Sequence, residues 1–168
     1  MNSKILDFYL GGRDDEGRTL DEILDWPDSE LEAVHDFIQW LFPLPERSSA
    51  NPSAPILDTA TIDTFCHSED LQERLRHSFL RMLHFYGLEF HEGVVRPGVH
   101  FSARSANWLN TGNHNHLRLT RMLRSLRVLG LTSESTALFQ ALSEIYGSNP
   151  RSITQRTFQF WSNAMSLE

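Results

Sequence analysis

Residues 68–86 read SEDLQERLRHSFLRMLHFY, and this stretch decides the fold class. Its apolar side chains recur at three- and four-residue spacing on one helix face, and they are Leu71, Leu75, Phe79, Met82 and Leu83. Gly87 follows directly, and glycine is the residue type that most often ends a helix. The stretch therefore predicts one long amphipathic helix, and similar helix signals dominate the rest of the chain.

Signals for helix starts and ends extend this pattern toward the N-terminus. Asn2-Ser3 opens a short helix that Gly11-Gly12 closes. Residues 19–22 form a capping box for a second short helix. Residues 29–32 form another capping box, which predicts a helix that runs until Pro43.

A long loop and a short strand-like stretch interrupt the helices. Residues 43–58 hold four of the seven prolines and predict an extended loop. Residues 88–101 contain the remaining strand-like sequence, and Pro97-Gly98 inside them argues against a real sheet. We therefore expect at most a small hairpin there.

Helix signals resume in the C-terminal half. Helices are expected near residues 102–109, 114–129 and 133–146, and Asn149-Pro150 resembles the start of a last one. The fold class predicted is all-α, a single compact domain of about seven to nine helices over residues 1–166, with little or no sheet. Residues 167–168 are expected to be a vector-derived tail.

Composition excludes several classes of protein. The formal net charge of −7 at pH 7 argues against a simple electrostatic binder of nucleic acid. The single cysteine, Cys66, excludes an intrachain disulfide and the usual cysteine-based zinc sites. No apolar run approaches the roughly 20 residues of a membrane helix, and no signal-peptide pattern follows Met1. We expect a cytoplasmic protein.

Charge is unevenly spread along the chain. Residues 1–36 hold eleven acidic and three basic side chains, whereas residues 93–133 hold six arginines and no acid. The two segments either meet in the fold or form separate solvated faces, or the arginines receive an anionic partner. The acidic run at residues 14–16, flanked by glycines, predicts a solvated loop.

Enzyme signatures are absent from the sequence. No phosphate-binding glycine loop, nucleophile elbow or HExxH motif occurs. His114 and His116 form the closest histidine pair, but two residues apart on a helix they point about 200° apart and cannot chelate one ion. We expect neither a metal site nor a cofactor.

Two stretches of the sequence are much more distinctive than these general composition and spacing patterns. The first is HDFIQWLFP at residues 35–43, followed by Asn51 and by APIL at residues 54–57. The second is Trp108 with HNHLRLTRML at residues 114–123, followed by residues 125–126 and 129–131. In this order, they resemble the conserved domain of the opioid growth factor receptor family, which is also found in bacteria.

The resemblance covers nearly the whole chain and implies a short member of the bacterial type. It implies receptor-type activity and the binding of a short, enkephalin-type peptide, and membrane terms accompany the family as a label. It supplies a family rather than a mechanism, so the candidate residues come from the geometry of the two motifs.

A helical wheel of the first motif places Trp40 nearly opposite the apolar stripe that begins at Leu31. Trp40 therefore lies either in a helix buried on all sides or along a groove. His35 and Gln39 lie one turn apart on one flank, and we expect them to bond the backbone of the proline-rich loop. Asn51 is expected to fix a turn of that loop.

The second motif places four polar side chains along one helix stripe: His114, Arg118, Arg121 and Ser125. This arginine stripe is either a solvated or ion-paired face or a receiver for a carboxylate. Arg118 is expected to be partly buried, in contact with a carboxylate or with the 43–58 loop. Arg124 and Arg127 are expected to be exposed.

These patterns predict a non-enzymatic recognition domain that binds a peptide or protein segment, with an acidic segment as one candidate. Its expected binding residues are His35, Gln39, Trp40, Asn51, Trp108, His114, Arg118 and Arg121. One alternative is nucleic-acid or anion binding along the helix from Arg118 to Arg127, which the acidic remainder of the chain disfavours. Another is an enzyme that pairs His35 or His114 with an acid.

Overall fold

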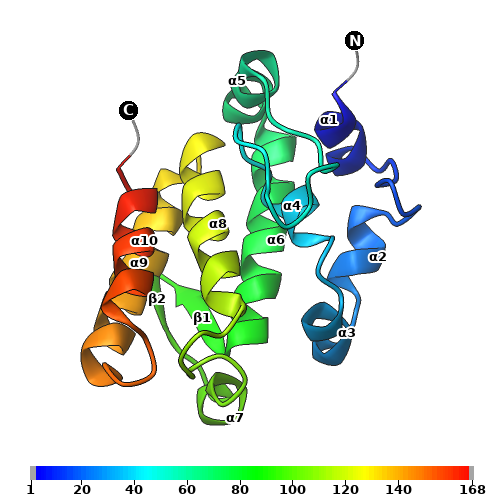
Figure 1. The fold of residues 1–168 in the computed structure, drawn as a ribbon. Helices are drawn as coiled ribbons and strands as arrows, with labels where there is room; N and C mark the ends of the chain where they lie inside the picture. Colours follow the sequence, from blue (N-terminus) through cyan, green and yellow to red (C-terminus); the bar gives the residue numbers. More distant parts are fainter. Residues whose placement is uncertain (1–2, 167–168) are drawn as a thin grey trace. The chain divides into compact units, whose positions relative to one another are not determined.

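Helices form most of residues 3–166, which are the residues described in this computed structural model. Their order is α1 (Lys4–Tyr9), α2 (Leu20–Leu24), α3 (Asp28–Ala33), α4 (Ile38–Leu41), α5 (Thr59–His67), α6 (Glu69–Tyr86), β1 (Leu88–His91), β2 (Val94–Pro97), α7 (Phe101–Ser105), α8 (Asn115–Val128), α9 (Thr132–Ser148) and α10 (Gln155–Ala164) (Figure 1). Ten helices in the described part confirm the helical class and slightly exceed the expected seven to nine. The helix-opening role of Asn2 and the tail at 167–168 lie outside it.

The chain divides after Ser78 into two compact units, residues 1–78 and residues 79–168. The boundary falls inside α6, so this helix begins in the first unit and ends in the second. The first 78 residues hold 17 acidic and six basic side chains, and residues 79–168 hold five and nine. The uneven charge of the sequence therefore follows the division, with formal charges of −11 and +4.

Tyr9 of α1 is central to the core of the first unit. Its side chain is fully buried, and its hydroxyl donates to the Leu41 carbonyl at 2.5 Å. The same hydroxyl shares a 3.0 Å hydrogen bond with the hydroxyl of Ser78 in α6. Next to it, the ring of Phe8 packs edge-on against Trp40 of α4, with 5.3 Å between centroids. Segments far apart in sequence thus share one apolar core.

The helix predicted over residues 30–42 is two helices. α3 ends where Val34 adopts an extended backbone with ψ of 132°, and α4 begins only at Ile38. The N-cap of α3 is Pro27, and Ser29 makes no capping hydrogen bond. The prediction was wrong because a tertiary ion pair, described below, holds the segment between the two helices.

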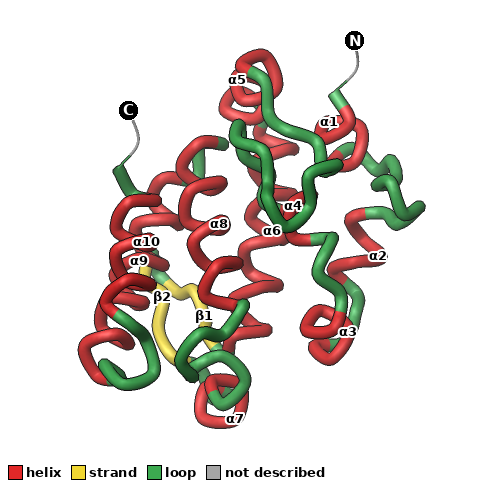
Figure 2. The backbone as a smooth tube through the Cα atoms, in the orientation of Figure 1, coloured by secondary structure: helices red, strands yellow, loops and turns green. Residues whose placement is uncertain are grey.

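Residues 43–58 contain no helix or strand, as their proline content predicts (Figure 2). Within this loop the Ala54 amide donates to the Asn51 carbonyl at 3.1 Å, and the Ser53 hydroxyl donates to Asn51 Oδ1 at 3.1 Å. The Leu57 amide donates to the Leu44 carbonyl at 3.0 Å, which closes the loop. The expectation that Asn51 fixes a turn is confirmed.

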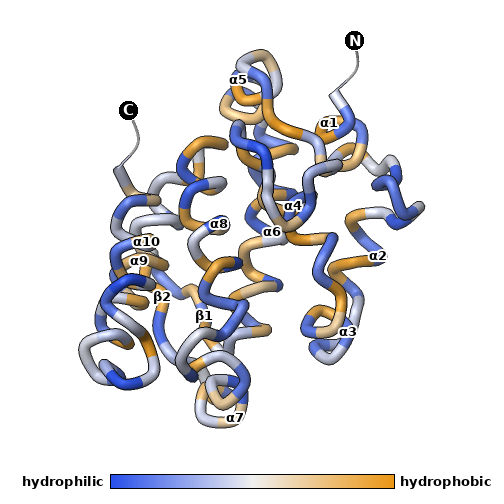
Figure 3. The backbone as a smooth tube through the Cα atoms, in the orientation of Figure 1, coloured by the Kyte–Doolittle hydropathy of each residue, from blue (hydrophilic) through white to orange (hydrophobic). Residues whose placement is uncertain are grey.

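In the second unit, α8 packs against both α9 and α10. The predicted apolar face of this helix is buried throughout, at Leu119, Met122, Leu123, Leu126 and Leu129. Figure 3 shows apolar and polar positions alternating along α8. The Trp161 indole of α10 donates to the His116 carbonyl at 3.1 Å, and the Ser135 hydroxyl of α9 donates to the Leu123 carbonyl at 2.7 Å.

The strand-like stretch forms one small hairpin. β1 and β2 pair antiparallel, from Leu88 opposite Pro97 to His91 opposite Val94. The two turn residues, Glu92-Gly93, have φ of +51° and +79°, which is the signature of a type I′ turn. This two-stranded hairpin is the one sheet within residues 3–166, which confirms the expectation of little or no sheet.

The start of the last helix differs from the prediction. The helix predicted to end at residue 146 continues as α9 through Gly147 to Ser148. Asn149-Pro150 does not begin α10, since the Thr154 side chain caps that helix by accepting from the amide three residues on, at 3.1 Å. Asn149 instead donates from Nδ2 to the Ile145 carbonyl at 2.9 Å, a contact at the end of the preceding helix.

Candidate functional site

A small polar cleft in the first unit lies between α4, the 43–58 loop and the loop before α2. Its lining residues are Asp15, Glu16, Asp36, Trp40, Asn51, Ser53 and Ala54. Its volume is about 40 Å³. Two of the predicted binding residues, Trp40 and Asn51, therefore meet on one concave surface, and three carboxylates surround them.

A tight turn supplies two of the cleft's carboxylates. Asp14 is buried, and its Oδ1 accepts the backbone N–H groups of Glu16 at 3.0 Å and Arg18 at 2.9 Å. Its own amide donates to the Arg18 carbonyl at 2.8 Å, and Gly17 takes the left-handed φ of +80° that this turn requires. The acidic side chains of Asp15 and Glu16 are therefore carried at the tip of an ordered turn.

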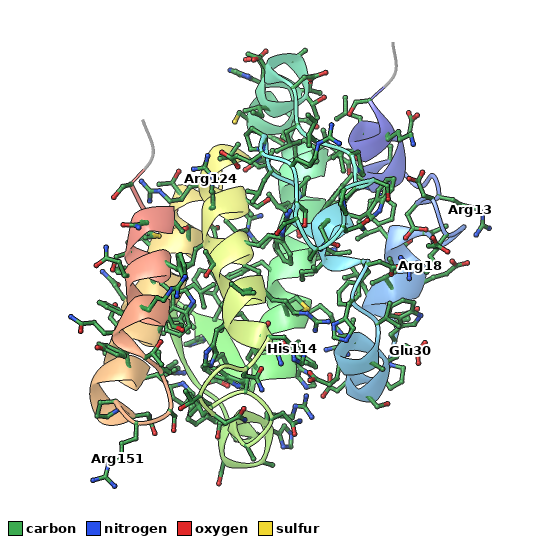
Figure 4. The ribbon with its side chains drawn as sticks, in the orientation of Figure 1. Arg13, Arg18, Glu30, His114, Arg124 and Arg151 are labelled. Atoms are coloured by element: carbon green, nitrogen blue, oxygen red, sulfur yellow. The ribbon has the colours of Figure 1, made fainter. Side chains whose placement is uncertain are left out.

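Arg18 holds the third carboxylate beside this turn. Its Nη2 lies 2.8 Å from Oδ2 of Asp14, and its Nη1 lies 2.9 Å from Oδ1 of Asp36. The guanidinium carbon also lies 5.4 Å from the ring centroid of Trp26. Figure 4 shows that Arg13, in contrast, extends away from the ribbon. The ion pair with Asp36 explains why the chain between α3 and α4 is held in a non-helical conformation.

Carboxylates outnumber cations around the cleft. Lys4 pairs with Asp15 at 3.1 Å, but these side chains are 63% and 46% exposed, so water screens the pair. Glu16 forms no ion pair within the described part of the chain. Arg13 donates to the Gly17 carbonyl of this turn and pairs with Glu22, so five carboxylates face three cations around the cleft and its turn, a formal balance of −2.

Trp40 forms part of the cleft wall, although it is only 3% exposed. Its indole N–H forms no hydrogen bond among residues 3–166, but it is not one of the buried atoms of these residues that lack a partner. Gln39 beside it is 5% exposed, and its Oε1 is a buried atom without a hydrogen-bond partner within the described chain. The expected hydrogen bond between the Gln39 side chain and the 43–58 loop is therefore not formed within the described residues, and His35 is exposed.

The predicted binding residues of the second unit lie elsewhere, and Trp108 has a structural role. It is 1% exposed, and its indole N–H donates to the Tyr86 carbonyl at 3.0 Å. Its own carbonyl accepts from Nε2 of His116 at 2.7 Å. Trp108 therefore ties the segment before α8 to the end of α6.

The arginine stripe predicted on α8 is not a solvent-facing stripe. Arg118 is 5% exposed and Ser125 is fully buried, while Arg121 is half-buried and His114 is exposed. This exposure confirms the expected burial of Arg118, whose Nη1 group donates to Oδ1 of Asn115 at 3.4 Å. Its contact with the 43–58 loop stays a prediction.

The two arginines predicted to be exposed, Arg124 and Arg127, are half-buried. Arg127 donates from Nη1 to the hydroxyl of Thr136 in α9, at 3.5 Å. The expectation was wrong because α8 packs against two helices, so its covered surface is wider than the single stripe that the helical wheel assigns.

His116 is the buried histidine of the second unit. Burial lowers its pKa below the usual value, the hydrogen bond to Trp108 opposes this, and the charge of His114 adds to it. Since Nε2 donates to a carbonyl, Nδ1 carries no proton in the neutral ring, and this atom has no partner among the residues described. The same residues contain no group of three or more His, Cys, Asp or Glu side chains placed to hold a metal ion.

The sequence matches the family model of the opioid growth factor receptor conserved region over residues 3–167. The chain belongs to this family.

Its mouse relative, opioid growth factor receptor, is 40% identical over 121 residues, which are 68% of this chain and 19% of the mouse protein. The human receptor has the same identity over the same length, 18% of its own chain. Opioid growth factor receptor-like protein 1 of Xenopus tropicalis is 36% identical over 120 residues, 68% of this chain and 23% of that protein. The chain thus spans about a fifth of these family members. No solved structure matches it.

None of the helices among residues 3–166 has the length and apolar character needed to cross a membrane.

Sequence reasoning missed the carboxylates of the cleft. The acidic run at residues 14–16 predicts a solvated loop, yet its first member is buried and organises the turn. The available signal was Gly17, one residue beyond the run, because a glycine there permits the left-handed turn that aims the acids. Asp36 lies inside the family motif, but its pairing with Arg18 depends on the tertiary fold.

Proposed function

We propose that this chain is a non-enzymatic recognition domain that binds a peptide or protein segment through the cleft of its first unit. One observation carries the proposal: Trp40 and Asn51, eleven positions apart, line the same cleft. The relatives bear the name receptor, which agrees with a role in recognition. The short, enkephalin-type peptide implied by the family is one candidate ligand.

The size of the cleft favours one side chain of a larger ligand over a whole small molecule. Pockets for drug-sized ligands usually enclose about 300–1,000 Å³, whereas this cleft encloses about 40 Å³. The rest of a bound segment would lie on the surface around it. Ile56 belongs to the same loop as Asn51 and is 52% exposed, so an apolar contact is available on that loop.

Binding of an acidic segment, or of nucleic acid, along α8 has less support. Arg118 and Ser125 are buried, and Arg121 is half-buried, so the arginine stripe does not present a row of solvated guanidinium groups. These alternatives become the preferred interpretation only if binding depends on the α8 arginines and not on the cleft.

A peptide array followed by calorimetry tests the proposal. Asn51→Ala removes an amide from the cleft, and Asn163→Ala makes the same change on the exposed side of α10. Peptides that bind the wild-type chain should bind Asn51→Ala about tenfold more weakly, a loss of about 1.4 kcal/mol. Asn163→Ala should leave the affinity unchanged, and circular dichroism should show both variants folded. The absence of any binder, or equal effects of the two substitutions, would refute the proposal.

A further inference from the structure

We infer that the cleft receives the ammonium group of a lysine side chain, carried by a basic segment of a partner protein. This inference rests on the proposed function, because it names the chemistry that the same cleft recognises. Three observations carry it: the size of the cleft, its surplus of carboxylates, and the negative charge of the unit that contains it.

The size selects a compact cation. A cavity needs about 10–15 Å³ for each water-sized group, so about 40 Å³ holds an ammonium group and the methylene that carries it. A guanidinium group is planar and broader, with five N–H donors in a fixed fork. Lysine therefore fits inside the cleft, whereas arginine fits only at its mouth.

The cleft wall supplies acceptors for the three N–H groups of an ammonium ion. Glu16 forms no ion pair within the described part of the chain, so its carboxylate is available. Asp36 uses Oδ1 for Arg18, and its second oxygen lies on a side chain that is 45% exposed. Asn51 adds an amide oxygen that is now shared with Ser53. The balance of −2 around the cleft is reduced when a cation enters.

Trp40 supplies a hydrogen-bond donor that a bound segment, unlike a free cation, can engage. Its indole N–H donates to no group among residues 3–166 and is not one of their buried unpaired atoms, so this donor is available to a ligand. Its side chain borders the cleft, so a bound ligand can provide the acceptor. A backbone carbonyl of the segment that carries the lysine is an acceptor of that kind.

The charge of the whole first unit favours a basic partner. Residues 1–78 carry a formal charge of −11. Such a field raises the local concentration of cationic segments and speeds their association, and salt weakens both effects. The field attracts any basic segment, whereas the cleft distinguishes lysine from other cations.

The test uses the full chain and synthetic ten-residue peptides of alternating lysine and serine, acetylated at the N-terminus and amidated at the C-terminus. Matched peptides carry arginine, acetyl-lysine or glutamate at every lysine position. Glu16→Gln is compared with Glu30→Gln, because both remove one exposed negative charge from the first unit and Glu16 alone of the two lines the cleft. Binding is measured by fluorescence anisotropy at two salt concentrations.

The lysine peptide should bind, and acetylation of its lysines should weaken binding by about tenfold or more because the charge is lost. Glu16→Gln should weaken binding of the lysine peptide about fivefold, and Glu30→Gln less than about twofold. The arginine peptide should bind more weakly than the lysine peptide. Higher salt should weaken binding to the wild-type chain and to both variants.

Three results would overturn the inference. Equal losses for the two glutamate variants would mean diffuse attraction by the acidic unit. Arginine peptides that bind as tightly as lysine peptides would exclude selection by size. A further acetyl-lysine peptide, made with a free N-terminal amine, serves as a control, and binding as tight as that of the lysine peptide would assign the cleft to an N-terminal ammonium group. In each case, the proposed function would still hold if other peptides bind the wild-type chain and bind Asn51→Ala more weakly. If no peptide shows this dependence on Asn51, both the inference and the proposed function are refuted.

Discussion

Replacing Gly87 by alanine should destabilise the second unit, because the chain has no room for a methyl group there. A Cβ at this position would lie 2.7 Å from Cα of Phe101 and 3.0 Å from Cβ of Arg104. Neither atom is the far end of a flexible side chain, so neither can swing away. Gly93 provides the matched control, because it has the same φ of +79° and a Cβ added there would meet no atom within 4 Å.

The two positions separate backbone strain from steric crowding. The left-handed conformation costs each alanine about 1–2 kcal/mol. Crowding against α7 adds about 1–3 kcal/mol at Gly87 alone. The free energy of unfolding should therefore fall by about 1–2 kcal/mol in Gly93→Ala and by about 2–5 kcal/mol in Gly87→Ala.

Urea denaturation, followed by tryptophan fluorescence and circular dichroism, measures this difference. The slopes of the unfolding transitions should be equal, so that a change in midpoint reports a change in stability. If both variants lose the same free energy within about 0.5 kcal/mol, the close approach of Gly87 to Phe101 does not constrain the fold and the reasoning is refuted.

Three further predictions concern single side chains. His116→Gln should flatten the pH dependence of stability. Because burial lowers the pKa of His116 below 6.5, the unfolded chain binds the extra proton as pH falls below that value. The stability that the wild-type chain has at pH 8 therefore declines toward pH 5. His91→Gln should retain that decline in pH-dependent melts. Thr19→Ala should lower the free energy of unfolding by about 0.5–2 kcal/mol because it removes the capping box. The control Ser29→Ala should change it by less than about 0.5 kcal/mol. Equal losses in urea melts of the two variants would contradict the capping assignment. Arg118→Ala should lower the free energy of unfolding by about 1–3 kcal/mol, because the buried Oδ1 of Asn115 loses its donor. A change below about 0.5 kcal/mol would mean that the contacts of the buried guanidinium contribute little to stability.

Element ends that depend on sequence neighbours were predictable. The capping box at Thr19 and the N-cap at Ser3 form as expected, because their hydrogen bonds reach only three residues along the chain. The break between α3 and α4 was not predictable, since it involves the contact of Arg18 with Asp36, 18 positions away. Apolar spacing at Leu31 and beyond suggests one helix and contains no information about this ion pair.

The candidate site was predictable in part for the same reason. Trp40 and Asn51 were identified from the motif that resembles the family, and the structure places both on one cleft. The carboxylates of Asp15 and Glu16 were not, because an acidic run has the same composition whether it is solvated or ordered. The two backbone hydrogen bonds accepted by Asp14 make the difference, and a sequence does not display them.

The contacts of Arg18 have a consequence for how this family varies. One guanidinium group bridges Asp14 and Asp36, which belong to separate segments. A lysine there would bring a single compact charge and could not span both carboxylates in the same way. Loss of the arginine would leave two acids close together without their shared counterion. Across homologous sequences, the residues at positions 14, 18 and 36 should therefore be inherited as a set, and a lineage that replaces the arginine should have replaced both acids.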